Sequence, residues 1–146
     1  MSPQGIGGDD RCGVYALVKS YELSPVKPYL LFTTDEETGA KGAKTFVKCL
    51  DQLPELKELK LIIEIDRRGR NDAVYYDCDN PDIEEYINSK GFVTDYGTFS
   101  DISVIAPALG IAAVNLSSGY YNAHQLHEYI NRAELEATIT KVVEIV

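Results

Sequence analysis

Carboxylates recur in this sequence where apolar stretches give way to polar ones. An Asp-Asp pair begins at Asp9 after a glycine-rich turn, a Glu-Glu pair begins at Glu36 after one apolar run, and Asp66 follows another. One histidine, His124, lies in the loop expected after a further apolar run. Carboxylate oxygens with an imidazole nitrogen suit zinc, and also manganese or cobalt. These residue types predict a divalent-metal site, and hydrolysis by metal-activated water is the chemistry that such a site supports.

Each of these groups also has a structural explanation when it is taken alone. An Asp-Asp pair before a helix commonly caps that helix, and a Glu-Glu pair in a loop is commonly solvated. A single aspartate such as Asp66 or Asp101 commonly forms a turn, and His124 and His127, the two histidines of the sequence, could both be exposed. Taken together these explanations weaken, because carboxylates that meet at one place repel one another and call for a cation.

Helices and strands alternate along the chain, and they must bring these side chains to one place. We expect helices over 13–23, 40–53, 81–90, 101–109 and 132–146, and apolar strands over 29–34, 59–65, 73–78 and 111–116. Pro81 is expected at the first position of its helix, and Gly91 ends that helix. Strands that are apolar on both faces and alternate with helices are typical of a mostly parallel sheet covered on each side. The sequence therefore predicts an α/β fold, a three-layer α/β/α sandwich whose ligands bind at the carboxyl ends of the strands.

The composition limits the classes of function. The 146 residues fit one domain, 1–146, and 45% hydrophobic with 25% charged residues is the profile of a globular protein. The formal net charge of −9 repels phosphate backbones, so we expect no nucleic-acid partner. No apolar run reaches transmembrane length, so we expect no membrane partner. Three cysteines without a CxxC pair favour a reducing, cytoplasmic setting over a disulfide framework.

Four segments in order resemble those of one enzyme family. GDDRCGV at 8–14 resembles a Gly-(Ala/Gly)-Asp-Asp-x-x-Gly segment, and TDEETG at 34–39 resembles an x-Glu-Glu-x-Gly segment. ID at 65–66 resembles an aspartate after a long strand, and GYYNAHQLHE at 119–128 resembles a closing Gly-x-x-x-x-His-x-x-x-Glu segment. The chain is therefore similar to the co-catalytic zinc exopeptidases, the zinc aminopeptidase and peptidase T-like group, over nearly its whole length.

The resemblance implies a ligand set for two metal ions. By this correspondence Asp9 would bridge the two metals, Glu37 and His124 would complete one of them, and Asp66 would serve the other. The distances along the chain, 27 residues from Asp9 to Glu36, 29 from Glu37 to Asp66 and 58 from Asp66 to His124, leave no room for a lid domain.

The resemblance also implies a proton carrier and three supporting residues. Glu36 would be the general base that takes a proton from the activated water and passes it to the leaving amine. Asp10, Asp101 and Glu128 would support the site, and the Asp9–Asp10 peptide would be cis as it is in the family. The activity implied is that of a metal-dependent, aminopeptidase-like exopeptidase that hydrolyses terminal peptide bonds of a peptide substrate.

One family segment, a His-x-Asp sequence before the Asp-Asp pair, has no counterpart here. No histidine precedes His124, so we expect an N-terminally shortened catalytic domain that binds one zinc at most and hydrolyses weakly. Upstream strands that are absent would leave a sheet edge or an uncovered face, so we also expect a homo-oligomer. The alternative is a non-catalytic or incomplete peptidase-fold fragment that acts as a binding or interaction module, one that could need a partner chain.

Overall fold

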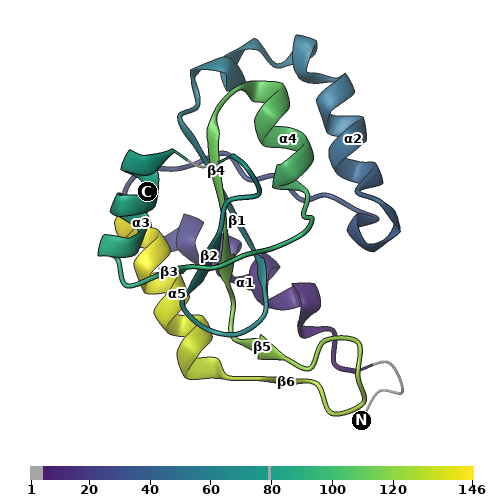
Figure 1. Cartoon of the computed structure of the whole chain (residues 1–146), viewed down its shortest axis with the longest axis vertical. Coiled ribbons are helices and arrows are strands. Elements are labelled where there is room, and N and C mark those ends of the chain that lie inside the picture. The colour runs from purple at the N-terminus through teal and green to yellow at the C-terminus, as the bar shows by residue number, and fades with distance from the viewer. Residues whose placement is uncertain (1–4, 79) are drawn as a thin grey trace.

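A four-stranded sheet organises the chain. The computed structural model describes residues 5–78 and 80–146, and Figure 1 shows the order of its elements. The helices are α1 Gly8–Leu23, α2 Lys41–Lys48, α3 Pro81–Ser89, α4 Ile102–Leu109 and α5 Arg132–Ile145. The strands are β1 Leu61–Arg67, β2 Asp72–Val74, β3 Val93–Thr94, β4 Ala112–Ser117, β5 Tyr120–Tyr121 and β6 Tyr129–Ile130.

The sheet has the order β1-β4-β2-β3 and is mostly parallel. Strand β1 pairs with β4 in parallel, with Ile63 opposite Val114, and β2 pairs with β3 in parallel. The contact between β2 and β4 is antiparallel. Strands β5 and β6 form a separate antiparallel ribbon. The prediction of an α/β fold with a mostly parallel sheet is confirmed, with one antiparallel pairing inside it.

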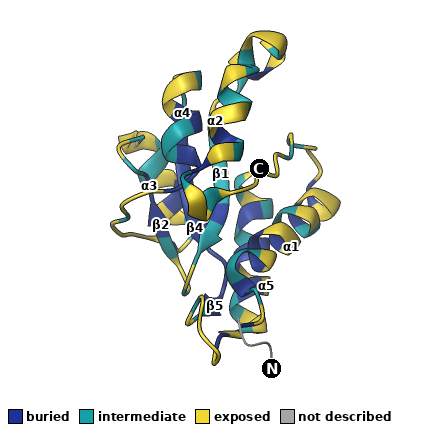
Figure 2. Ribbon diagram, turned by 90° about the vertical axis from the view of Figure 1, so that its right-hand side faces the viewer, coloured by how far each residue is buried: buried dark blue, intermediate teal, exposed yellow. Residues whose placement is uncertain are grey.

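Helices pack against the sheet from opposite sides, as Figure 2 shows for α1 and α5 on one side and α4 on the other. Successive residues of β1 point to different faces, because side chains alternate along a strand. Ile63 and Ile65 pack in the cluster that includes α1 and α5, whereas Ile62 packs against residues of α2 and α4. Among the described residues, none of the helices combines the length and the apolar character needed to cross a bilayer.

The expected strand at 29–34 is wrong. This segment pairs with no strand in the part of the chain that the structure describes, and its apolar side chains are largely exposed, with Tyr29 at 64% and Phe32 at 50%. An apolar run becomes a strand only where a neighbouring strand receives its backbone hydrogen bonds, and β1 pairs on one edge alone among the described residues. The segment is held by other contacts, since the carbonyl of Thr34 accepts the Gly42 N–H at 2.9 Å and Thr33 donates to Asp101.

Two other expected elements are too long. The helix expected over 40–53 ends as α2 at Lys48, and short 3-10 turns follow at Leu50–Gln52 and Pro54–Glu58. Pro54 disfavours the helical region at the residue before it, which accounts for the non-helical Leu53. The strand expected over 73–78 ends at Val74, because the backbone then turns through Tyr76 and Asp77, both with positive φ.

The expected ends of α3 and the position of α5 agree with the structure. Helix α3 starts at Pro81, and the side chain of Asn80 accepts the Asp82 N–H at 3.0 Å. Gly91, with φ 81°, follows the end of that helix. Helix α1 starts at Gly8, earlier than the expected residue 13, because the Asp-Asp pair lies within its distorted first turn. The strand expected over 59–65 is β1, which runs on through Asp66 to Arg67.

Candidate metal centre

Three separate segments bring a carboxylate, a second carboxylate and an imidazole together. Asp9 lies in the first turn of α1, Glu37 in the 3-10 turn Glu36–Thr38, and His124 in the loop between β5 and β6. The Nε2 atom of His124 is 3.2 Å from Oδ2 of Asp9 and 3.0 Å from Oε1 of Glu37. One ligand atom from each of the three residues lies within 4.8 Å of the other two. This is the spacing that one metal-sized position requires.

The backbone around each ligand departs from regular structure. The Asp9–Asp10 peptide is cis, as the resemblance implies, and both residues have non-helical dihedral angles inside α1. Asp35, immediately before the 3-10 turn that carries Glu37, and His124 itself have φ near 60°. Residues other than glycine rarely adopt this left-handed region, and such residues are concentrated at functional sites.

Glu128 joins the His124 loop to the start of α1. Its carboxylate accepts the backbone N–H groups of Ile6 at 2.7 Å, Gly7 at 2.8 Å and Asp9 at 3.2 Å, and the residue is 7% exposed. Burial alone would raise the pKa of Glu128, but these backbone donors hold it below its usual value. A charged carboxylate with three donors fixes the two segments relative to each other, so Glu128 sets the separation of Asp9 and His124.

Two further carboxyl groups, those of Asp10 and Asp66, lie behind Asp9. Burial raises the pKa of Asp10 to about 7, although the Gly13 N–H, which donates to Asp10 Oδ1 at 2.9 Å, opposes the shift. Burial and the neighbouring charges of Asp10 and Asp9 raise the pKa of Asp66 to about 10. Asp66 Oδ1 is buried and has no hydrogen-bond partner among the described residues. Without a cation, these carboxyl groups share protons instead of all being ionised.

Glu36 lies beside the three converging ligands but is not one of them. It is partly buried, and burial, followed by the charges of Glu37 and Asp101, raises its pKa. Asp101 is buried at the start of α4, where one carboxylate oxygen accepts from Thr33 and the other has no partner among the described residues.

Sequence reasoning missed a polar network inside the sheet. The register of β1 and β4 places Glu64 opposite Asn115. Ser100 donates to Glu64, and the amide of Asn115 donates to Ser100 Oγ at 3.1 Å and to the Asp66 carbonyl at 3.2 Å. Burial raises the pKa of Glu64 to about 8, although the Ser100 hydrogen bond opposes the shift. The signal was present in the sequence as Glu64 within the apolar stretch 61–65 and Asn115 within the apolar stretch 111–116.

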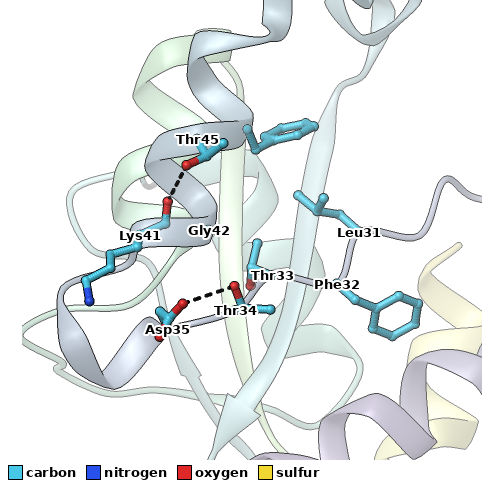
Figure 3. Close-up of a pocket in the computed structure, with 9 residues that line it drawn as sticks. Leu31, Phe32, Thr33, Thr34, Asp35, Lys41, Gly42 and Thr45 are labelled. Carbon is cyan, nitrogen blue, oxygen red and sulfur yellow. Dashed lines mark hydrogen bonds between the residues drawn. The ribbon is translucent and has the colours of Figure 1, made fainter.

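The site is an open surface rather than a closed pocket. Two hollows are found elsewhere on the described part of the chain. Figure 3 shows one of about 290 Å³ formed by the 31–35 segment and the start of α2. The other, of about 450 Å³, lies by Tyr76 and Tyr96. Asp9, Glu37 and His124 line neither of them, and the His124 side chain is 62% exposed. A molecule that binds to Asp9, Glu37 and His124 would therefore reach them directly from solvent.

The fold is shared with a peptidase of known structure. The crystal structure of a peptidase M28 precursor from Shewanella amazonensis SB2B is similar to 96% of this chain, with a TM-score of 0.58 and 20% sequence identity. This chain spans 36% of that protein, or about a third of its length. No family model matches the chain, and no curated protein matches it by sequence. At this identity the likeness shows a peptidase-like α/β fold.

Proposed function

We propose that this chain is a metal-dependent exopeptidase of the aminopeptidase-like kind, which binds one zinc ion through Asp9, Glu37 and His124. The observation that carries the proposal is the convergence of their ligand atoms within 4.8 Å from three distant segments. Two carboxylates and one imidazole would supply three protein ligands to zinc, which is the ligand number of catalytic rather than structural zinc sites. The shared fold with a peptidase supports the same assignment.

The roles of the remaining residues follow from their surroundings. Zinc held by these residues would supply a water molecule that is acidic near neutral pH. Glu36, whose pKa is raised, would accept a proton at its carboxylate and return it to the amine of the departing residue. Asp66 and Asp9 offer too few oxygens for a second tightly held zinc, so we assign one metal per chain.

The proposal extends to the architecture and the substrate. We assign the helices and the mostly parallel sheet to one three-layer α/β/α domain without a lid, in the zinc peptidase class. The exposed His124 and the open surface around it suit the end of a peptide chain, which reaches the site without threading through a cavity. Peptides are the substrate class, and hydrolysis removes a terminal residue.

A second candidate is a non-catalytic module with the same fold. The buried carboxyl groups of Asp10 and Asp66 favour it. Because their pKa values are raised, these groups can stay protonated and neutral, so the site is stable without a cation. A chain of this kind would bind a partner and would neither require metal nor hydrolyse peptides. The two candidates differ in metal content and in the effect of a Glu36 substitution.

The deciding experiment measures bound metal and hydrolysis on the same preparation. Elemental analysis after zinc loading is expected to give one zinc per chain, and aminoacyl reporter substrates are expected to be cleaved only with zinc present. Glu36→Gln should lower hydrolysis by about 10²–10⁴-fold, the usual contribution of a general base, while zinc content stays at one per chain. Glu85→Gln, on the exposed side of α3, is the matched control and should retain full activity. No zinc uptake together with no cleavage would establish the second candidate, whereas zinc-independent cleavage would contradict both candidates.

A further inference from the structure

The loop that carries His124 is held by a very short ribbon. Strands β5 and β6 have two residues each, and they pair antiparallel, with Tyr120 opposite Ile130 and Tyr121 opposite Tyr129. Figure 1 shows this ribbon at the lower end of the molecule, with β6 leading directly into α5. A two-stranded hairpin by itself is marginally stable in water at best. The ribbon therefore needs side-chain contacts to fix the loop between its strands.

One face of the ribbon packs on the start of α1. Residues that lie opposite each other in an antiparallel pair share a face, so Tyr120 and Ile130 point the same way. An added Cβ at Gly8 would lie 3.0 Å from Cβ of Tyr120 and 3.3 Å from Cγ1 of Ile130. Both side chains thus approach the backbone directly before Asp9. This face sets the ribbon against the segment that carries one of the proposed metal ligands.

The other face is closed by two stacked tyrosines. The ring centroids of Tyr121 and Tyr129 are 4.9 Å apart, and the ring planes are inclined by only 9°. Aromatic residues that lie directly opposite each other stabilise the pairing of their strands. The stack joins a residue shortly before His124 to the residue directly after Glu128. It therefore closes the loop at its base.

Tyr121 also links the ribbon to α5. Its hydroxyl donates to Oε2 of Glu134 at 2.6 Å. Burial, followed by the Glu134 carboxylate, raises the pKa of Tyr121 to about 12, so the hydroxyl keeps its proton at neutral pH. Glu134 lies in the first turn of α5, where the helix dipole favours a carboxylate, and Arg70 is 3.9 Å from its other oxygen. The acceptor of the Tyr121 hydrogen bond is thus itself held in place, with its side chain only 19% exposed.

We propose that Tyr121 is a positioning residue for the metal ligand His124. Through its ring stack and its hydrogen bond it holds the arm of the ribbon that leads into His124, while Glu128 holds the arm that leads out. Zinc–ligand distances lie within about 0.2 Å of fixed values, so a loop that moves at this arm withdraws the imidazole from the two carboxylates. The inference rests on the proposed zinc site, and Tyr121 acts through His124 without touching the metal.

Zinc affinity tests the proposal without a measurement of hydrolysis. Competition with a fluorescent chelator should show that Tyr121→Leu weakens zinc binding by about 10–100-fold, the usual effect of a residue that supports a ligand. Tyr121→Phe keeps the ring and should lose less, whereas Tyr129→Phe keeps the stack and should bind as the unaltered protein does. Tyr86→Leu is the matched control, because Tyr86 is a partly exposed tyrosine on α3 whose hydroxyl donates to the Glu144 carbonyl at 3.3 Å. It should leave zinc affinity unchanged.

Two further measurements test how Tyr121 acts. Tyr121→Phe combined with Glu134→Ala should weaken zinc binding no more than the stronger single variant, because both substitutions remove the same hydrogen bond. The visible absorption of bound Co²⁺ depends on the arrangement of its ligands. This spectrum should change in Tyr121→Leu and stay unchanged in Tyr86→Leu, a difference that a general loss of stability does not produce.

Hydrogen exchange of the metal-free protein separates the order of the loop from folding. Tyr121→Leu should speed amide exchange at 122–128 while α1 and α5 keep their protection. Tyr121→Phe supplies the same comparison if Tyr121→Leu does not fold. Unchanged exchange in the loop, or a zinc affinity equal to that of the unaltered protein, would overturn the positioning role and leave the proposed function standing. A lack of zinc binding by the unaltered protein would overturn the proposed function, and with it the role given to Tyr121.

Discussion

The imidazole Nε2 of His124 lies 3.0 Å from the carboxylate of Glu37 and 3.2 Å from that of Asp9. Ionised carboxylate oxygens only accept hydrogen bonds, whereas a zinc ion accepts electron pairs from carboxylate oxygens and from an imidazole nitrogen alike. The three ligand atoms are close enough together for one such ion to bind all of them. The proposed function assigns a zinc ion to this position, and the first prediction tests that assignment.

Removal of the imidazole should abolish tight zinc binding. We expect His124→Ala to weaken zinc affinity by more than about 100-fold, since even residues that only support a ligand contribute about 10–100-fold. His127→Ala removes the other histidine, which is exposed and outside the triad, and should leave affinity unchanged. Competition with a fluorescent zinc chelator measures both. Equal losses of zinc affinity in the two variants would show that zinc binds nonspecifically to exposed histidines.

The metal-free protein should lose stability as pH rises. The folded pKa of Asp66, about 10, lies above its unfolded value of 3.8, so the folded state holds a proton that the unfolded state releases. The stabilisation from this group is therefore complete below the unfolded pKa and is lost as pH rises through the folded one, with a slope of at most about 1.4 kcal/mol per pH unit. Urea unfolding with a chelator present should show this decline between about pH 5 and pH 9.

Asp66→Asn should make that decline shallower, because the amide does not titrate. Asp51→Asn, at an exposed position, should leave the slope as it is. Zinc added at about pH 8 should restore stability to the unaltered protein, because ligand binding to the folded state raises the free energy of unfolding. An Asp66→Asn protein with an unaltered slope would show that Asp66 is ionised without metal.

Glu128→Gln should destabilise the fold and the site together. The carboxylate accepts three backbone N–H groups, and loss of its charge should cost about 2 kcal/mol or more at neutral pH. Its pKa is lowered in the folded state, so this contribution is present above the unfolded value of 4.5 and disappears as pH falls through the folded value. Urea unfolding at neutral and acid pH measures the difference, with exposed Glu55→Gln as the control.

Gly13→Ala should cost far more than another glycine substitution. An added Cβ at Gly13 would lie 1.8 Å from the Ile65 carbonyl oxygen and 2.4 Å from the Asp10 carboxylate, so α1 would have to move away from β1. We expect a loss of roughly 3 kcal/mol or more. Gly110→Ala meets no atom within 4 Å and bears only the cost of its positive φ, about 1 kcal/mol. Thermal unfolding of the two variants measures both losses of stability. The difference between them separates the steric clash of α1 with β1 from the cost of backbone strain alone.

Local chemistry in the sequence determined several features by itself. Asn80 and Pro81 specify the start of α3, and Gly91 follows its end, because caps depend on side chains only a few residues away. Residue type and the order of the segments marked Asp9, Glu37 and His124 as candidate ligands. Their approach to one position was expected as well, since the carboxyl ends of parallel strands meet at one edge of a sheet.

Tertiary structure alone decided the features that depend on a distant partner. The apolar run at 29–34 reads as a strand, but backbone donors and acceptors form a strand only beside another strand, and none is adjacent among the described residues. The pairing of Glu64 with Asn115 required the register of β1 and β4, which no short window of sequence contains. The burial of Cys12, Ala16 and Ser20 on one side of α1 was likewise visible only in the structure, because burial is a property of what surrounds a helix.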